Sequence, residues 1–422
     1  MRASPLGALT GVEPPPFNLP GSYFAVALLC LVLGGAGLAV IAPELAQGAY
    51  FSPRVTGVTH LFTLGWITTS IMGALYQFFP VALGKEVRWV GLARVTLGFY
   101  VPGLFAFVAG MLGAWSSLTV AGALLLGAGV LLFLLNTAFT LKGARRDLTW
   151  WALAFAAGFL LLTLVIGGAL AANLRWPFMA AARPVALATH LHVALAGWVL
   201  LVMVGVAHRL LPMFLLSHGA EERLGRFAVG LLAAGVLGLF SLHHVPSRWA
   251  RLVPGAAMLA GVVAFLLQAR AFYRHRKRPD LDVGMRLAGA SLMLLGIGAA
   301  SGAALLGVGF HHPRAATAYV LTVILGIALF IAAHYYKIIP FLVWYHRFGP
   351  LAGRQPVPRV AELFSSRWAG TAAQLLVLGA VGLVSGTWLG SGRVVRIGSI
   401  FFLAGVMIES VQMILLSRRR PA

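Results

Sequence analysis

The sequence predicts an all-α, polytopic membrane protein whose twelve transmembrane helices are arranged as three pseudo-symmetric four-helix repeats. Two observations predict the class. Of 422 residues, 60% are hydrophobic and only 10% are charged, and the mean hydropathy is +0.91. Because about a quarter of the residues of a typical soluble domain are charged, this composition excludes a water-soluble enzyme and indicates the lipid bilayer as a partner.

The helices follow from apolar runs, since a helix needs about 20 apolar residues to cross the hydrocarbon of a bilayer. One membrane domain is expected over 22–416, with repeats at about 22–145, 149–275 and 287–416. A cytoplasmic leader without a secretory apolar region precedes it over 1–21, and a basic tail follows over 417–422. The twelve apolar runs lie near 22–43, 57–83, 95–113, 118–141, 149–172, 186–216, 227–243, 253–272, 287–308, 317–346, 368–388 and 397–416.

The basic residues predict the orientation. Twenty-two Lys and Arg residues lie at the N-terminus or after even-numbered helices, against eight on the other side. The positive-inside rule therefore places both termini in the cytoplasm, and a bacterial inner membrane is expected. The excess of 32 Lys and Arg over 10 Asp and Glu is spread in short clusters between apolar runs, so nucleic acid is not an expected partner.

An internal repeat supports the threefold division. In His60…Gly65-Trp66…Pro80 and His192…Gly197-Trp198…Pro212, a histidine precedes Gly-Trp by five residues and proline by twenty. The third copy ends in Tyr335-Tyr336-Lys-Ile-Ile-Pro340 and has Val320 at the histidine position. Because twenty helical residues rise about 30 Å, each histidine is expected near the outer surface and each proline near the cytoplasmic end.

Histidines gather at one predicted depth. Seven of the twelve fall at predicted outer helix ends: His60, His190, His192, His243, His244, His311 and His312. Titratable side chains are costly in hydrocarbon, and imidazole is a common ligand of haem iron and copper. The one cysteine, Cys30, excludes a cysteine-based cluster. For each histidine the alternative is a packing role, with the ring bonded to a carbonyl or touching headgroups; His208 and His334 are expected to pack in this way.

His190 and His192 lie two residues apart, which is about 200° around a helix, so they face opposite sides and one helix could serve two sites. The motifs His60…Gly65-Trp66…Gly73-Ala-Leu-Tyr76…Pro80 and His190-Leu-His192…Gly197-Trp198…Pro212 resemble helices of cbb3-type oxidases and nitric oxide reductases. Both belong to the heme-copper oxidase superfamily, subunit I. The resemblance implies that His60 ligates a low-spin haem, and that His192, His243 and His244 ligate copper.

One departure from that family stands out. The family carries His-x-His on helix 10, where this sequence has Ala318 and Val320, so the matching positions do not assemble a standard two-haem binuclear site. A looser resemblance to the NnrS-like membrane proteins, which are associated with nitric oxide stress, fits this loss better. The expectation is haem b between helices 2 and 6, held by His60 and one of His190 and His192, with copper and a cytochrome or small membrane subunit as further partners.

Acidic residues limit the function, because only Glu409 lies well inside a predicted helix. A proton pump usually needs a chain of intramembrane carboxylates, so redox-driven pumping is not expected. The predicted function is electron transfer or O2 and NO handling; an enzyme of this kind would be an oxidoreductase of the cytochrome c oxidase or nitric oxide reductase type. Two alternatives stay open: a secondary transporter or permease, and a non-catalytic assembly protein derived from an oxidase.

Overall fold

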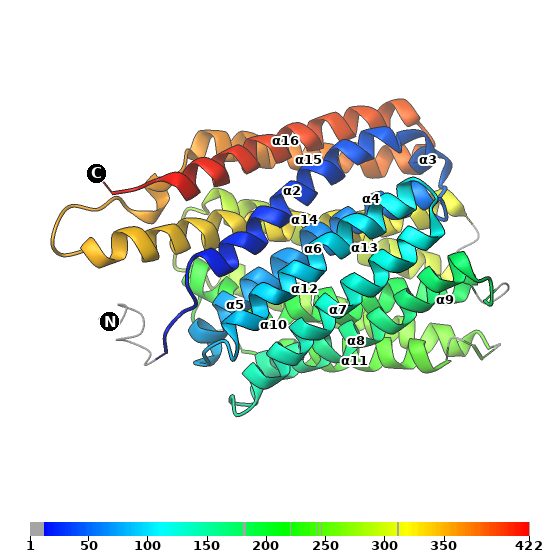
Figure 1. The fold of residues 1–422 in the computed structure, drawn as a ribbon, viewed down its shortest axis with the longest axis horizontal. Coiled ribbons are helices and arrows are strands. Elements are labelled where there is room, and N and C mark those ends of the chain that lie inside the picture. The colour runs from blue at the N-terminus through cyan, green and yellow to red at the C-terminus, as the bar shows by residue number, and fades with distance from the viewer. Residues whose placement is uncertain are drawn as a thin grey trace. The chain divides into compact units, whose positions relative to one another are not determined.

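The computed structural model describes residues 12–179, 183–219, 221–242, 244, 245, 247–309 and 312–421. Within these residues, twelve helices are long and apolar enough to cross a membrane, and no β-strand occurs. The predicted class, an all-α polytopic membrane protein, is confirmed (Figure 1).

The chain divides into two compact units, which are formed by the described residues of Met1–Glu86, Asp280–Gly298 and Phe310–Ala422 and by those of Val87–Pro279 and Ala299–Gly309. Unit 1 contains α2 (Asn18–Val40), α3 (Ala42–Gln47), α4 (Pro53–His60), η1 (Leu61–Thr68), α5 (Thr69–Leu83), α14 (Pro313–Val343), η4 (Trp344–Phe348), η5 (Gly349–Leu351), η6 (Val360–Leu363), α15 (Ser366–Leu389) and α16 (Gly392–Arg418). Unit 2 contains α6 (Val90–Leu112), α7 (Ser116–Leu141), α8 (Leu148–Arg175), α9 (Arg183–His192), η3 (Val193–Leu200), α10 (Leu201–Leu215), α11 (Arg223–Leu242) and α12 (Trp249–Arg274). Helix α13 (Val283–Val308) is one continuous helix, whose residues up to Gly298 belong to unit 1 and whose remaining residues belong to unit 2.

The observed spans begin and end within five residues of the predicted ones. Helix α2 begins at Asn18, inside the predicted leader, and ends at Val40, and α3 follows Ile41 as a separate short helix. Pro43 explains the break, because proline is accepted in the first turn of a helix and its ring clashes with the carbonyl four residues earlier when a helix continues through it.

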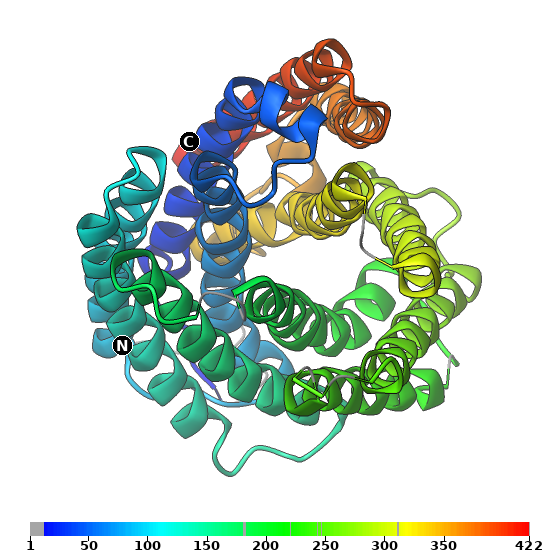
Figure 2. The ribbon, with the colours of Figure 1, turned by 90° about the vertical axis from the view of Figure 1, so that its right-hand side faces the viewer.

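The third and fourth helices of each repeat form a closely packed hairpin. The pairs are α6 with α7, α11 with α12, and α15 with α16, the last seen in red and orange beside the blue α2 in Figure 2. A Cβ on Gly103 would lie 2.3 Å from a backbone nitrogen of α7, and one on Gly379 would lie 2.4 Å from a backbone nitrogen of α16. Small residues therefore let the helix backbones touch, as is common between membrane helices.

The first and second helices of each repeat share another close contact. Seven residues before the proline, the second helix carries Gly73, Gly205 or Ala333. A Cβ on Gly73 would lie 2.6 Å from an atom of α2, and one on Gly205 would lie 2.7 Å from an atom of α8. The carbonyl of Ala333 lies against Gly284 of α13, 2.8 Å from where a Cβ there would stand. In all three repeats, the residue seven positions before the proline of the second helix thus packs against the start of the first helix.

A buried amide on each fourth helix binds the start of the third helix. Asn136 of α7 accepts from the N–H of Trp89 at 3.1 Å and donates to its carbonyl at 3.0 Å. Gln268 of α12 accepts from the N–H of Gly225 at 3.2 Å. Gln412, in the orientation that satisfies both of its groups, bonds a carbonyl and an N–H at the start of α15, at 3.0 and 3.2 Å. The N–H groups of Trp89 and Gly225 stand at helix starts, where the helix itself supplies no acceptor, and these amides supply one.

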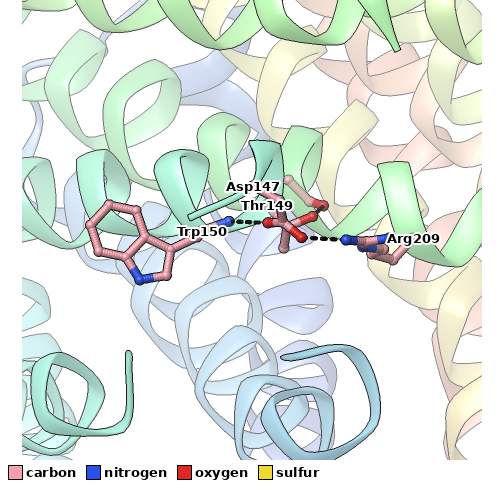
Figure 3. A network of polar contacts seen from close by, with 5 residues as sticks. Asp147, Thr149, Trp150 and Arg209 are labelled. Carbon is pink, nitrogen blue, oxygen red and sulfur yellow. Dashed lines mark hydrogen bonds and ion pairs between the residues drawn. The ribbon is translucent and has the colours of Figure 1, made fainter. Parts of the chain in front are cut away.

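The second and third repeats each contain an equivalent ion pair. Asp147 precedes α8 and Asp282 precedes α13, and one carboxylate oxygen of each accepts from the backbone N–H three residues later, at 3.0 and 3.1 Å. The other oxygen pairs with Arg209 of α10 or Lys337 of α14, each three residues before the proline. Figure 3 shows both contacts of Asp147. Gln77 occupies the corresponding position of the first repeat.

Candidate functional site

Two predicted ligand histidines occupy the same local structure. His60 is the last residue of α4, and the π-helical η1 begins directly after it. His192 is the last residue of α9, and the π-helical η3 begins directly after it. Both π segments are eight residues long and contain the Gly-Trp pair of the repeat. Because π-helical turns are rare and often occur at functional sites, these two positions are the candidate site.

Side-chain contacts hold the first π segment in place. Thr69 Oγ1 donates to the carbonyl of Leu64, five residues earlier, at 2.9 Å. Trp66 is fully buried, and its ring N–H donates to the carbonyl of Ala328 in α14 at 3.3 Å. The irregular backbone after His60 is therefore supported by neighbouring groups, as non-helical backbone at membrane depth requires.

The imidazole rings of both histidines are oriented by their own helices. His60 Nδ1 lies 2.8 Å from the carbonyl of Thr56, and His192 Nδ1 lies 2.8 Å from the carbonyl of Ala188. Each ring is half-buried. A hydrogen bond from Nδ1–H to a carbonyl fixes the tautomer in which Nε2 carries the lone pair, and this arrangement is usual for histidines that bind a metal through Nε2.

The bond at Nδ1 alone does not define a site. His208, His275 and His334 make the same contact with the carbonyl four residues earlier, at 2.6, 2.9 and 2.7 Å. His208 and His334 are buried, and their rings lie against Phe272 and Phe330, which are the contacts that a packing role predicts. The π segment that follows the ring is what separates His60 and His192 from these three.

The third copy of the repeat provides an internal comparison. Val320 stands at the histidine position, and α14 continues as a regular α-helix from Pro313 to Val343. The π segment of this span, η4, comes only after the proline. Packing of a second helix in this repeat therefore does not require π geometry, and the two copies that have it are the two that carry the histidine.

His190 has a different environment from His192. Its ring lies against Gly167 of α8, where a Cβ would stand 2.8 Å from Cε1 of the imidazole. The absence of a side chain at Gly167 makes room for this ring. His60 belongs to unit 1, whereas His190 and His192 belong to unit 2, so their pairing about one haem stays a prediction.

The predicted copper ligands are placed only in part. His192 ends α9, His244 is exposed in the turn after α11, and His243 lies outside the described residues. Among the residues that are described, no three or more His, Cys, Asp or Glu side chains come together as a metal-binding group. The copper site, which includes His243, stays a prediction.

A small apolar cavity of about 30 Å³ lies in unit 1 next to His60 in sequence. Residues on both sides of the histidine line it, namely Thr59 and Phe62, with Leu38 of α2 and Leu321 of α14 across from them. The charged residues nearest to His60 in α4 and α3 are paired with each other, Arg54 with Glu44 at 2.9 Å. The residues on either side of His60 therefore border apolar side chains, and the ion pair of α3 and α4 is neutralised.

No protein-family model matches the chain, and no curated protein matches it. The fold and the local geometry therefore define only the class: a polytopic α-helical membrane protein with two equivalent histidine sites, each followed by a π-helical segment.

Proposed function

We propose that the protein is a haem-binding membrane protein related to subunit I of the heme-copper oxidases, which transfers electrons or handles O2 or NO without pumping protons. The observation that carries the proposal is the repeated pairing of a half-buried histidine with a π-helical segment, at His60 and at His192. The third repeat lacks both features at the corresponding position, where α14 is a regular α-helix, so packing does not account for them.

The residues present fit a haem. The Nδ1 atoms of His60 and His192 bond backbone carbonyls, which is the orientation of histidines that bind a metal through Nε2. His60 and one of His190 and His192 would hold haem b, which when bound supplies one-electron chemistry. The apolar cavity beside Thr59 and Phe62 is of a size for one very small molecule, which suits a diatomic gas.

The rest of the setting is part of the same proposal. Both termini lie in the cytoplasm of a bacterial inner membrane, because 22 basic residues lie on that side against eight on the other. His192, His243 and His244 form a copper site at the outer surface. A cytochrome or another small membrane subunit donates the electrons, because the chain carries neither a cysteine pair for a c-type haem nor a cluster motif.

The test is a dithionite-reduced minus oxidised spectrum with a pyridine haemochrome assay on detergent-purified protein from haem-replete cells. His60→Ala and His192→Ala should each lose the reduced α-band. His275→Ala is the matched control, because that ring makes the same Nδ1 bond but no π segment follows it, and it should keep the spectrum.

A further variant separates the two histidines of α9. Gly167→Ala places a methyl group 2.8 Å from the ring of His190 and leaves His192 intact. A spectrum altered by Gly167→Ala and kept in His192→Ala would assign the ligand to His190. A colourless wild-type protein would overturn the proposal and favour a transporter or an assembly protein.

A further inference from the structure

Glu409 is a buried carboxyl group in α16 that the proposed haem site does not use. Its exposed fraction is 0%, and neither carboxyl oxygen has a hydrogen-bond partner among the residues that the structure describes. An ionised carboxylate without compensation costs several kcal/mol in such surroundings. Acidic residues inside membrane helices are therefore rare and mark pathways for ions or protons.

Comparison of the repeats shows that packing does not require an acid at this position. Each fourth helix carries a glycine, then a large side chain four residues later, then the buried amide three residues after that. The large residue is Phe133 in the first repeat, Phe265 in the second and Glu409 in the third. Phe133 and Phe265 are buried, with exposed fractions of 0% and 1%. The third repeat has thus replaced an aromatic ring with a carboxyl group in the same buried place.

The surroundings of Glu409 in unit 1 are polar on one side. Gln412 lies one turn further along α16, and its side-chain amide is 3.4 Å from the hydroxyl of Tyr336. Tyr335 and Tyr336 of α14 are both close enough to Glu409 to interact with it electrostatically. Tyr335 in turn shares a hydrogen bond of 2.7 Å with Ser70 of α5. A hydroxyl group can accept one proton and donate another, so these groups can pass a proton on.

The polar groups continue along α5. Gln77 lies two turns after Ser70 on the same face of the helix, and is 6% exposed. Neither atom of its amide has a partner among the described residues. Two turns rise about 11 Å, so a connection from Ser70 to the Gln77 amide requires bridging water molecules. This line of groups runs from Tyr335 toward the end of α5 that carries Pro80.

Among the described residues, no group bonds to the Glu409 carboxyl. The cations of α14 are engaged elsewhere, because Lys337 is paired with Asp282 and the Arg314 guanidinium lies against Gly390. The ionisable groups near Glu409 are Tyr335 and Tyr336 from α14 and, on α2, Cys30, which lies near Tyr335. Helix α15 carries one ionisable residue, Arg367 in its first turn, and the acid of α3, Glu44, is already paired with Arg54. A proton is therefore the group available to neutralise the carboxylate.

We propose that Glu409 is a proton-binding site within the membrane, connected through Tyr335 and Ser70 to Gln77. In the exchange, the Glu409 O–H bond breaks and its proton passes through a bridging water molecule to the hydroxyl oxygen of Tyr335, while the O–H proton of Tyr335 moves to the hydroxyl oxygen of Ser70. The reverse sequence reloads the carboxyl group. This inference does not depend on haem binding, because none of its residues belongs to the histidine sites.

The experiment is pH-difference infrared spectroscopy of the full chain in lipid nanodiscs, with dicyclohexylcarbodiimide labelling followed by mass spectrometry. This probe reacts with protonated carboxyl groups in apolar surroundings. The wild type should show the C=O band of a protonated carboxyl group and a label on Glu409, and Glu409→Gln should lose both. Glu44→Gln is the control and should change neither, because Glu44 is ion-paired. Tyr335→Phe should keep the label and slow hydrogen–deuterium exchange of the carboxyl group at least tenfold.

A second variant, Glu409→Leu, checks folding. It should be at least as resistant to thermal unfolding as the wild type, because a buried polar group is replaced by an apolar one. A C=O band that persists in Glu409→Gln would overturn the proposal. Protection of Glu409 from the carbodiimide by Na⁺ at constant pH would also overturn it, and would identify a metal-ion site instead.

Discussion

Asn136 is the amide whose loss should cost most, and its replacement tests the contact that the three repeats share. Asn136→Leu keeps the side-chain volume and removes both bonds to Trp89. An orphaned backbone group costs about 1–3 kcal/mol. The orphaned group is the Trp89 N–H, because the Trp89 carbonyl keeps its bond from the N–H of Ala93 at 3.1 Å. At the carbonyl only one hydrogen bond is lost, which is worth about 1 kcal/mol. The expected loss in the free energy of unfolding is therefore at least about 2 kcal/mol.

The second amide gives a graded comparison. Gln268→Leu removes one bond, to Gly225, together with a side-chain nitrogen that has no partner among the described residues, so its cost should be about half as large. The assay is equilibrium unfolding in mixed detergent micelles, followed by circular dichroism. Leu135→Ala, at an exposed position of α7, is the control and should change little. If Asn136→Leu matches the wild type within about 0.5 kcal/mol, or if Gln268→Leu costs more, the reasoning is refuted.

Three further substitutions test other shared contacts by the same unfolding assay. Gly103→Ala brings a methyl group to 2.3 Å from the α7 backbone and should lower the free energy of unfolding by about 1–3 kcal/mol. Its control is Gly98→Ala in the same helix, where the methyl group meets nothing within 4 Å and the change should be neutral or stabilising. Equal effects of the two variants would contradict the packing argument. Asp147→Asn keeps a side chain that can cap α8 and removes the charge. A double-mutant cycle with Arg209→Gln should give a coupling energy of about 0.5 kcal/mol, because the Arg209 side chain is 43% exposed. A coupling energy of zero would show that the ion pair does not contribute to stability. Gly225→Ala would put a methyl group 1.9 Å from Nε2 of the buried His208. It should reduce the yield of folded protein, measured by size-exclusion chromatography. An unchanged yield would show that the His208 ring can move aside.

The sequence predicts the spans well, because twenty apolar residues in a row have few alternatives to a membrane helix. It also predicts the second helices of the repeat, whose histidine, Gly-Trp and proline are visible at fixed spacing. It does not predict the π segments, because a π turn changes the backbone bonding without changing the apolar composition. The residue closest to a sequence signal for the π segment is Thr69, because its hydroxyl donates to the carbonyl five residues earlier.

Other contacts were present in the sequence as weaker patterns. Each fourth helix contains a glycine followed seven residues later by an amide, ending in Asn136, Gln268 and Gln412. A single amide in an apolar helix says little, and only alignment of all three repeats indicates a shared partner. Arg209 and Lys337 were visible as cations inside helices, but their pairing with Asp147 and Asp282 depends on how the second helix packs on the start of the first.

The repeats separate what the fold needs from what it does not. Each second helix keeps the proline and the small residue seven positions before it, and each fourth helix keeps the amide; these residues make the same contacts three times and are explained by packing. Besides Gln77, which stands where the other second helices carry Arg209 and Lys337, the departures lie at two kinds of position. Two second helices place a histidine before a π segment, and one fourth helix places Glu409 where the others have phenylalanine. Since the equivalent copies fold without these groups, they are the residues for which packing gives no reason, and they are where the chemistry is to be sought.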